Sequence, residues 1–169
     1  LLAEAAGSSL GKARALKLEP QTEAAAIRRR QRDTSQAAFI IGRYGSMPLG
    51  GLTDVTDTLK RARAQASLSG GELLAVGNLI YCADRLREYF AEGEDLAPDL
   101  ARQAAQLSDQ GALREQIERT LDDDGEVRRD ASDELDRLYN RQAILEGRAR
   151  DRMDSLMRQA AAGDVLQDP

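Results

Sequence analysis

Apolar side chains recur every three to four residues along most of the chain, which is the spacing of one face of an α-helix. The first such run contains Leu2, Ala6, Leu10 and Ala13, and the Gly-Ser-Ser sequence at residues 7–9 interrupts it. Because Pro20 cannot continue a helix, the pattern predicts two short helices before it.

A longer helical pattern follows Pro20. Thr22 is placed to cap a helix from about residue 23 to 41, because its hydroxyl can accept a hydrogen bond from a free backbone N–H of the first turn. The residues expected to face inward are Ala26, Ile27, Ala37, Ala38 and Ile41. Four glycines and a proline then predict a loop over residues 42–52, the largest stretch expected to be non-helical.

Two further helix starts are readable in the middle of the chain. Asp54 opens a short helix, and Ser69 with Glu72 forms a capping box, in which each side chain accepts from the backbone N–H of the other residue. The long helix that follows is expected to pack a wide apolar face in a bundle. That face comprises Leu73, Val76, Leu79, Ile80, Ala83, Leu86, Arg87 and Phe90.

Shorter elements connect this helix to the C-terminal part. Pro98 is tolerated in the first turn of a helix, where its missing N–H costs nothing. The spacing of Leu113, Ile117 and Leu121 predicts the next helix, and the acidic residues 122–124 with Gly125 predict a turn.

Ser132 caps the longest expected helix, from Asp133 to about Ala162. About 30 residues at 1.5 Å each give a length of about 45 Å, more than a compact domain of this size is wide, so this helix should project. Its narrow apolar stripe comprises Leu135, Leu138, Leu145, Ala149, Met153, Leu156 and Ala160. Ion pairs four residues apart are expected for Asp133 with Arg137, Glu146 with Arg150, and Asp154 with Arg158.

The pattern therefore predicts an all-α protein with a multi-helix core at residues 1–131 and one long projecting C-terminal helix within residues 132–169. An abundance of Ala and Leu with only 4% aromatic residues agrees with helix rather than sheet. Because Leu1 begins the chain inside an apolar pattern, without an initiator Met or a capping residue, we expect a segment of something longer.

Composition excludes most familiar active sites. The chain has no His and one Cys, so it lacks the commonest general base and metal ligand and cannot form an internal disulfide or a thiolate zinc site. Cys82 lies in the best-patterned helix and is expected to be a buried apolar residue. No pair of carboxylates is isolated among apolar residues, so we expect no catalytic residue, cofactor site or metal site in this chain.

Net charge and hydropathy indicate which partners and which cellular location to expect. With 24 basic and 29 acidic residues the net charge is -5, which argues against attraction of the whole surface to phosphate. No apolar run approaches the roughly 20 residues that cross a bilayer, and no signal peptide opens the chain. We therefore expect no membrane partner and a cytoplasmic location.

Two strings resemble ligand-binding loops but fail in detail. Residues 7–13 (GSSLGKA) have three residues between the glycines where a phosphate-binding P-loop has four, and Ala13 lacks the hydroxyl that holds magnesium. If Gly125 is aligned with the glycine of a calcium loop, Ala131 falls where a bidentate Glu is required. A turn between helices is the better interpretation of both.

Two groups of arginines remain as candidates for phosphate contacts. The denser group, Arg28, Arg29, Arg30 and Arg32, wraps around its helix because consecutive residues point about 100° apart, so it is interpreted as a solvated surface. The looser group lies on the projecting helix, and we take it as the candidate nucleic-acid-binding site. Its members are Arg148, Arg150, Arg152 and Arg158.

Residues 124–138 (DGEVRRDASDELDRL) resemble the entry to the lever helix of MutS-family ATPases. The resemblance extends along essentially the whole chain to the N-terminal region of the second MutS subfamily of bacteria, MutS-two. The segments that carry it are residues 10–12 (LGK), 16–20 (LKLEP), 48–54 (PLGGLTD), 68–69 (LS) with 72–73 (EL), and 166–169 (LQDP).

The resemblance implies that the parent protein is a homodimeric, DNA-binding ATPase and endonuclease that acts on branched DNA, suppresses homologous recombination and belongs to DNA repair. ATP and magnesium would be bound by the parent outside this chain. Some members are implicated in ribosome quality control, which adds the ribosome as a partner of the parent. This chain would be the non-catalytic helical core and lever that precede a clamp.

Residues 90–92 (FAE) match the Phe-x-Glu motif that mismatch-reading MutS proteins carry in a domain that MutS-two proteins lack. They fall at an expected helix end without the surrounding motif, so Phe90 is interpreted as a core residue.

A second hypothesis remains open: the narrow stripe of the long helix pairs with another helix, and the chain is a protein–protein interaction or dimerisation module with no nucleic-acid role.

Overall fold

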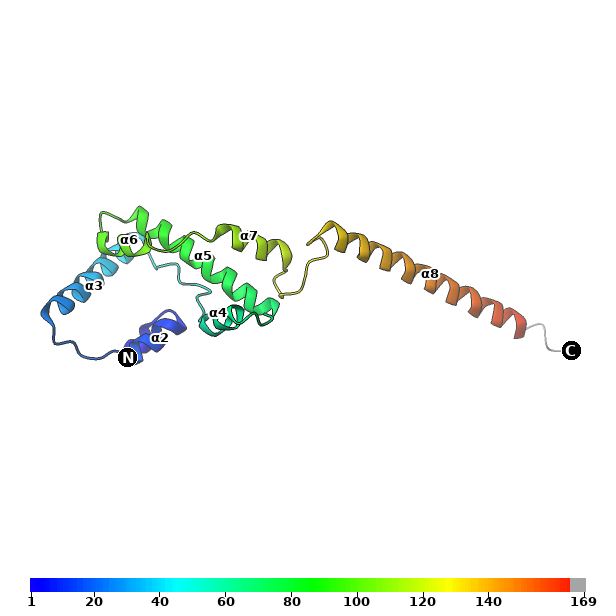
Figure 1. Ribbon diagram of the computed structural model, residues 1–169, viewed down its shortest axis with the longest axis horizontal. Coiled ribbons are helices and arrows are strands. Elements are labelled where there is room, and N and C mark those ends of the chain that lie inside the picture. Colours follow the sequence, from blue (N-terminus) through cyan, green and yellow to red (C-terminus); the bar gives the residue numbers. More distant parts are fainter. Residues whose placement is uncertain (165–169) are drawn as a thin grey trace. The chain divides into compact units, whose positions relative to one another are not determined.

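The computed structural model describes residues 1–164, with side chains as far as residue 161 (Figure 1). Within these residues every regular element is a helix, so the expected all-α class is confirmed. The helices are α1 (Leu2–Ala5), α2 (Ser9–Leu16), α3 (Ala24–Tyr44), α4 (Thr56–Arg63), α5 (Gly70–Glu92), α6 (Pro98–Ala104), α7 (Gly111–Thr120) and α8 (Asp133–Asp164). No helix of the described part is long and apolar enough to span a membrane.

The chain forms two compact units. The first, here called the body, spans Leu1–Glu126, and the second begins at Val127 and contains α8. The division at residues 131 and 132 drawn from the sequence, and the projection of the long helix, stay predictions. Residues 166–169, which carry the last part of the family resemblance, lie outside the described residues.

The core of the body forms where α3 and α6 meet the C-terminal half of α5. Ile40 of α3 is fully buried and packs with Phe90 of α5, Ala97 and Ala104. A Cβ built on Gly93, just after α5, would overlap the side chain of Ile40, so the absence of a side chain there lets α3 approach. Phe90 is only 8% exposed, which confirms its interpretation as a core residue.

Helix α7 packs against the N-terminal half of α5. A Cβ built on Gly77 would lie 3.6 Å from the Ile117 side chain, which is an ordinary packing distance. Ile117 and Leu121 are both buried, as the four-residue spacing predicts, whereas Leu113 is 43% exposed. The body therefore uses α5 as the helix against which both α6 and α7 are packed.

The capping box at the start of α5 is confirmed. The Ser69 backbone N–H donates to Glu72 Oε2 at 2.8 Å, and the Glu72 N–H donates to Ser69 Oγ at 3.3 Å. The hydrogen bond from the Ser69 backbone is the main reason why the pKa of Glu72 is held below its ordinary value. Arg61 of α4 also pairs with this carboxylate, so the cap links two helices.

The turn after α7 is confirmed and is closely packed. The Asp122 N–H donates to the Glu126 carbonyl oxygen at 2.9 Å, and Gly125 has φ of 80°, a left-handed conformation that glycine adopts without strain. A Cβ built on Gly70 would overlap the carbonyl group of Gly125. Both glycines are therefore needed for this turn to reach the first residue of α5.

Three details of α3 differ from the sequence-based expectation. The N-cap is Glu23, without a side-chain cap hydrogen bond, and not Thr22. Helix α3 passes through Gly42 and ends at Tyr44. The Tyr44 hydroxyl donates to the Glu92 carbonyl oxygen, and Gly45 supplies the positive φ just after the helix end. Of the residues expected to face inward, Ala26, Ile27 and Ala37 are partly buried as expected, whereas Ala38 and Ile41 are exposed and the buried residue is Ile40.

The C-terminal unit is dominated by α8, an uninterrupted helix of 32 residues. Ser132 caps it as expected, since its Oγ accepts from the Leu135 N–H at 3.2 Å. The three expected acid–base pairs are not among the ion pairs of residues 127–161. Glu146 instead accepts from Gln142 at 2.9 Å, and Arg158 donates to the Asp154 carbonyl oxygen at 3.2 Å.

Candidate functional site

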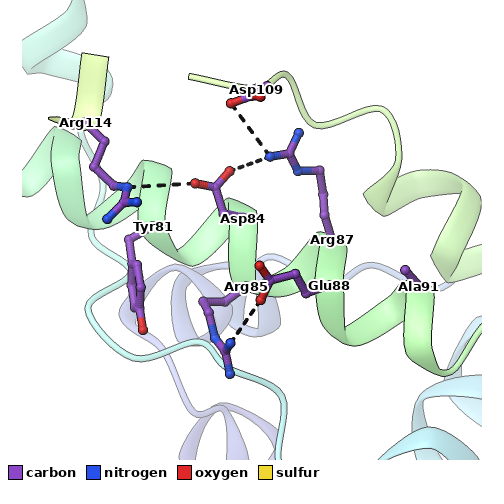
Figure 2. Close-up of a pocket in the computed structure, with 8 residues that line it drawn as sticks. All are labelled: Tyr81, Asp84, Arg85, Arg87, Glu88, Ala91, Asp109 and Arg114. Carbon is purple, nitrogen blue, oxygen red and sulfur yellow. Dashed lines mark hydrogen bonds and ion pairs between the residues drawn. The ribbon is translucent and has the colours of Figure 1, made fainter. Parts of the chain in front are cut away.

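A shallow depression lined by charged residues lies between α5 and α7 (Figure 2). At its centre Asp84 accepts a hydrogen bond from Arg87 at 2.6 Å, and its other carboxylate oxygen lies 3.9 Å from Arg114 Nε. Arg87 also lies 4.0 Å from Asp109, at the start of the turn into α7. The guanidinium of Arg114 lies 5.7 Å from the centre of the Tyr81 ring.

These charges neutralise one another. Arg85 pairs with Glu88 at 3.0 Å, and Arg114 pairs with Glu118 at 2.8 Å, so each carboxylate in the depression faces a guanidinium. The depression therefore contributes to the packing of α7 on α5.

Sequence reasoning missed this network and placed Arg87 in the apolar line of α5. The pair Asp84 and Arg87 is local, three residues apart, and could have been inferred from spacing. Arg114 comes from a different helix, and no local pattern indicates that it lies beside Asp84.

Cys82 is 1% exposed, and its thiol donates to the Pro48 carbonyl oxygen at 3.2 Å. Burial raises the pKa of the thiol, which keeps it protonated and unreactive at neutral pH. Cys82 therefore holds the loop after α3 against α5, and its expected role as a core residue is confirmed.

The two loop-like strings form ordinary helix ends. The Ser8 Oγ accepts from the Gly11 N–H at 3.0 Å and caps α2, so the GSSLGKA string is a helix start rather than a phosphate cradle. No group of three or more His, Cys, Asp or Glu in the described part of the chain is arranged to hold a metal ion.

The candidate nucleic-acid-binding residues Arg148, Arg150, Arg152 and Arg158 are all exposed on α8. They do not form one face. Residues two apart on a helix point about 200° apart, so Arg148 and Arg152 lie on one side, and Arg150 lies on the other. At most about two of them can face one duplex at a time. Their contact with nucleic acid stays a prediction.

The apolar residues of α8 are exposed to an unusual degree. Leu138, Leu145, Met153 and Leu156 are 57%, 54%, 60% and 50% exposed, whereas the core of the body contains residues that are fully buried. Burial of such side chains against a partner is worth about 1.5–3 kcal/mol each. Helix α8 therefore offers an unoccupied contact face, and it is the candidate functional site.

Comparison with curated proteins gives consistent matches along the chain. Proteins named Endonuclease MutS2 are 32% identical in Geobacillus sp. (strain WCH70), over 99% of this chain, and 34% identical in Symbiobacterium thermophilum, over 100% of it. The match in Bacillus velezensis is 31% identical over 96% of this chain. No protein-family model matches.

The chain spans about a fifth of the length of these relatives, with 22% of the Geobacillus protein and 21% of the other two covered. The matched region includes both the body and α8, because the alignments cover nearly every residue of this chain. The resemblance inferred from the sequence is thereby confirmed, and the chain is homologous to one segment of the MutS2 endonucleases.

Proposed function

We propose that this chain is the non-catalytic helical core and lever of a MutS2 protein, and that it relays ATP-driven change to nucleic-acid binding. The single observation that carries the proposal is the continuous 32-residue helix α8 within a chain that matches MutS2 endonucleases over nearly all of its length. A helix can transmit displacement because its backbone hydrogen bonds are internal and it resists compression along its axis.

The remaining functions belong to the parent protein. It binds ATP and magnesium in a domain outside this chain, acts on branched DNA as a homodimeric endonuclease, and suppresses homologous recombination as part of DNA repair in the cytoplasm. A role in ribosome quality control, with the ribosome as a second partner, belongs to the same proposal. The support for these functions is the name that the relatives carry and the resemblance of residues 124–138 to a lever entry.

The test uses the parent protein with Leu145→Pro in the middle of α8. Proline removes a backbone hydrogen bond and kinks the helix, at a cost of about 3 kcal/mol or more. Leu145 is 54% exposed, so the side-chain change itself should cost little. We expect ATP hydrolysis without DNA to persist, while its stimulation by branched DNA is lost.

The matched control is Leu145→Ala, which shortens the same side chain and keeps the helix intact. It should preserve the stimulation by DNA. A proline variant that keeps full DNA-stimulated ATP hydrolysis would show that nothing is relayed through α8.

A second candidate function is a helical protein–protein interaction or dimerisation module without a nucleic-acid role. The exposed apolar residues of α8 and the net charge of -5 favour it. Sedimentation of this chain with and without branched DNA at low salt separates the candidates. Association that depends only on protein concentration, with no DNA retained and with normal DNA coupling in the Leu145→Pro parent, would favour the module.

A further inference from the structure

Four arginines of α8 lie in one row along the helix and are here called the arginine row: Arg137, Arg141, Arg148 and Arg152. At about 100° per residue, each of them points within about 30° of a common direction. All four are exposed. At about 1.5 Å per residue the row extends about 22 Å along the helix axis, so it offers a line of positive charge rather than a single cation.

Acidic residues lie away from this side of α8. Between residues 137 and 161 the helix has three of them, Glu146, Asp151 and Asp154. Asp151 points about 70° from the centre of the row, and the other two point about 130° or more away from it. Glu134 points toward the same side but precedes the row. The helix therefore presents an uninterrupted run of positive charge on this side.

The guanidinium groups of the row also lack partners in the structure. Of the residues that the structure describes, none forms a hydrogen bond or an ion pair with these four groups. The body differs, because five of its arginines each pair with a carboxylate: Arg61, Arg85, Arg87, Arg102 and Arg114. The guanidinium groups of the row therefore keep all their N–H donors available for a ligand.

The position of the row indicates from which side a ligand would approach. Its centre lies about a quarter of a turn around the helix from the apolar stripe. A membrane surface or an amphipathic partner helix would cover the stripe and meet both of its flanks. The flank away from the row contains Asp136, Arg150 and Asp154, so only one flank is basic. We therefore expect the ligand of the row to approach from the side and to leave the stripe free for a different contact.

The length of the row and its side-chain type favour a nucleic-acid duplex as this ligand. A duplex has one phosphate charge per about 1.7 Å of its axis, so about 13 phosphates accompany the length of the row. All four cations are arginine, whose planar guanidinium group can donate two parallel hydrogen bonds to one phosphate. We propose that the arginine row of α8 contacts the phosphate backbone of duplex DNA independently of base sequence, an inference that rests on the proposed function, in which the parent binds DNA.

The row differs from the set of arginines selected from the sequence. Arg150 points about 170° away from the centre of the row, and Arg158 points about 90° away from it. Arg158 also donates to the Asp154 carbonyl oxygen of its own helix. Arg137 and Arg141 were not selected from the sequence, but they lie in line with Arg148 and Arg152. The two sets therefore provide matched substitutions on one helix.

The test compares two double variants of the parent protein. Arg137→Gln with Arg141→Gln removes two charges from the row, and Arg150→Gln with Arg158→Gln removes two charges outside it. All four positions are exposed, and glutamine forms helix about as well as arginine, so α8 should stay intact. Equilibrium binding to two linear DNA duplexes of unrelated sequence is measured without ATP over a range of salt concentrations.

The row variant should make the slope of log K against log salt shallower by about 1.8 on both duplexes, which corresponds to two phosphate contacts at about 0.9 each. The variant outside the row should change the slope by less than about 0.9. A further control is Arg137→Lys with Arg141→Lys, which keeps both charges and should therefore keep the slope of the unmodified parent. A slope that is also lost with lysine would contradict the proposal, because the slope counts charges.

Two other outcomes would overturn the proposal while DNA binding by the parent persists. They are an unchanged slope in the row variant and equal changes in the two double variants. Failure of the proposed function gives a different result, since a parent that binds no duplex at all would lose its nucleic-acid role and this inference with it. The relay by α8 is measured separately, by ATP hydrolysis in the Leu145→Pro parent.

Discussion

The body and α8 are both helical but are stabilised in different ways. In the body, Ile40 is fully buried and Gly93 has no side chain so that α3 can approach α5. In α8, residues of the same type are in water: Ile144 is 57% exposed. The body is stabilised by contacts between helices, whereas α8 is stabilised by its own backbone hydrogen bonds and its N-terminal cap.

This difference determines where each region tolerates change. A packed core loses free energy when a side chain shrinks, because a cavity remains. The stability of an isolated helix depends instead on the helix propensity of its residues, on the absence of prolines and on any partner that covers its exposed face. The same substitution made in both regions should therefore give different results.

The largest expected difference in stability between the two regions comes from substituting isoleucine by alanine. Ile40→Ala should lower the free energy of unfolding of the body by about 3 kcal/mol, because it removes a fully buried side chain packed in the core. Ile144→Ala, the matched change on α8 and off its stripe, should change stability by less than about 0.5 kcal/mol. Urea denaturation of both variants measures this, and equal losses would contradict the division into two regions.

Glycine-to-alanine substitutions should change the stability of the two regions by smaller amounts and in opposite directions. Gly70→Ala should destabilise the body by about 2 kcal/mol, because its Cβ meets the backbone of Gly125, which cannot easily move. Gly147→Ala has open space around it and should stabilise α8 by about 1 kcal/mol through helix propensity. Circular dichroism during thermal unfolding measures both. A stabilised Gly70→Ala would show that the turn at Gly125 is loose.

The helix starts should differ in their response to acid. The pKa of Glu72 is lowered in the folded state from its ordinary value of 4.5, mainly by the hydrogen bond from Ser69. Its stabilisation is therefore fully present above pH 4.5 and is lost as the pH falls through the lower folded pKa.

Glu72→Gln should remove this part of the pH dependence, seen as a flatter plot of stability against pH below 4.5. Ser132→Ala, at the cap of α8, should leave the slope unchanged, because a serine does not titrate. The account of the capping box would be wrong if Glu72→Gln and the unmodified chain had the same slope.

The smallest expected effect concerns nucleic acid. In the parent, Arg148, Arg150, Arg152 and Arg158 are replaced by Gln. At most about two of these side chains face one duplex, so the slope of log K against log salt for DNA binding should become shallower by the equivalent of about two phosphate contacts. The matched control replaces Arg28, Arg29, Arg30 and Arg32, which wrap around α3. Equal effects of both quartets on the slope of log K against log salt would remove α8 as a binding site.

Much of the fold is predictable because its signals are local. Ser69 with Glu72, Ser132, and the Gly125 turn each depend on hydrogen bonds between residues close in sequence, and all three are confirmed. The register of α3 could not be predicted from the same kind of signal. Ile40 and Ile41 are equally apolar, and only the approach of Gly93, far away in the sequence, determines which is buried.

The candidate functional residues also fall into a group that local sequence patterns predict and a group that they do not. The stripe of α8 follows from spacing alone, whereas the network around Asp84 needs Arg114 from another helix and was missed. The function proposed for the parent depends on the similarity to MutS2 endonucleases and not on the geometry of these residues.

The most direct measurement is the length of α8 itself. Spin labels are attached to Arg137→Cys and Arg158→Cys in a chain with Cys82→Ala, diluted with unlabelled protein so that only distances within one chain are read. A continuous rod places the two backbone positions about 32 Å apart in a single narrow distribution. A markedly shorter or broad distribution would mean that α8 bends or folds back, and a helix that does so cannot transmit displacement between its ends.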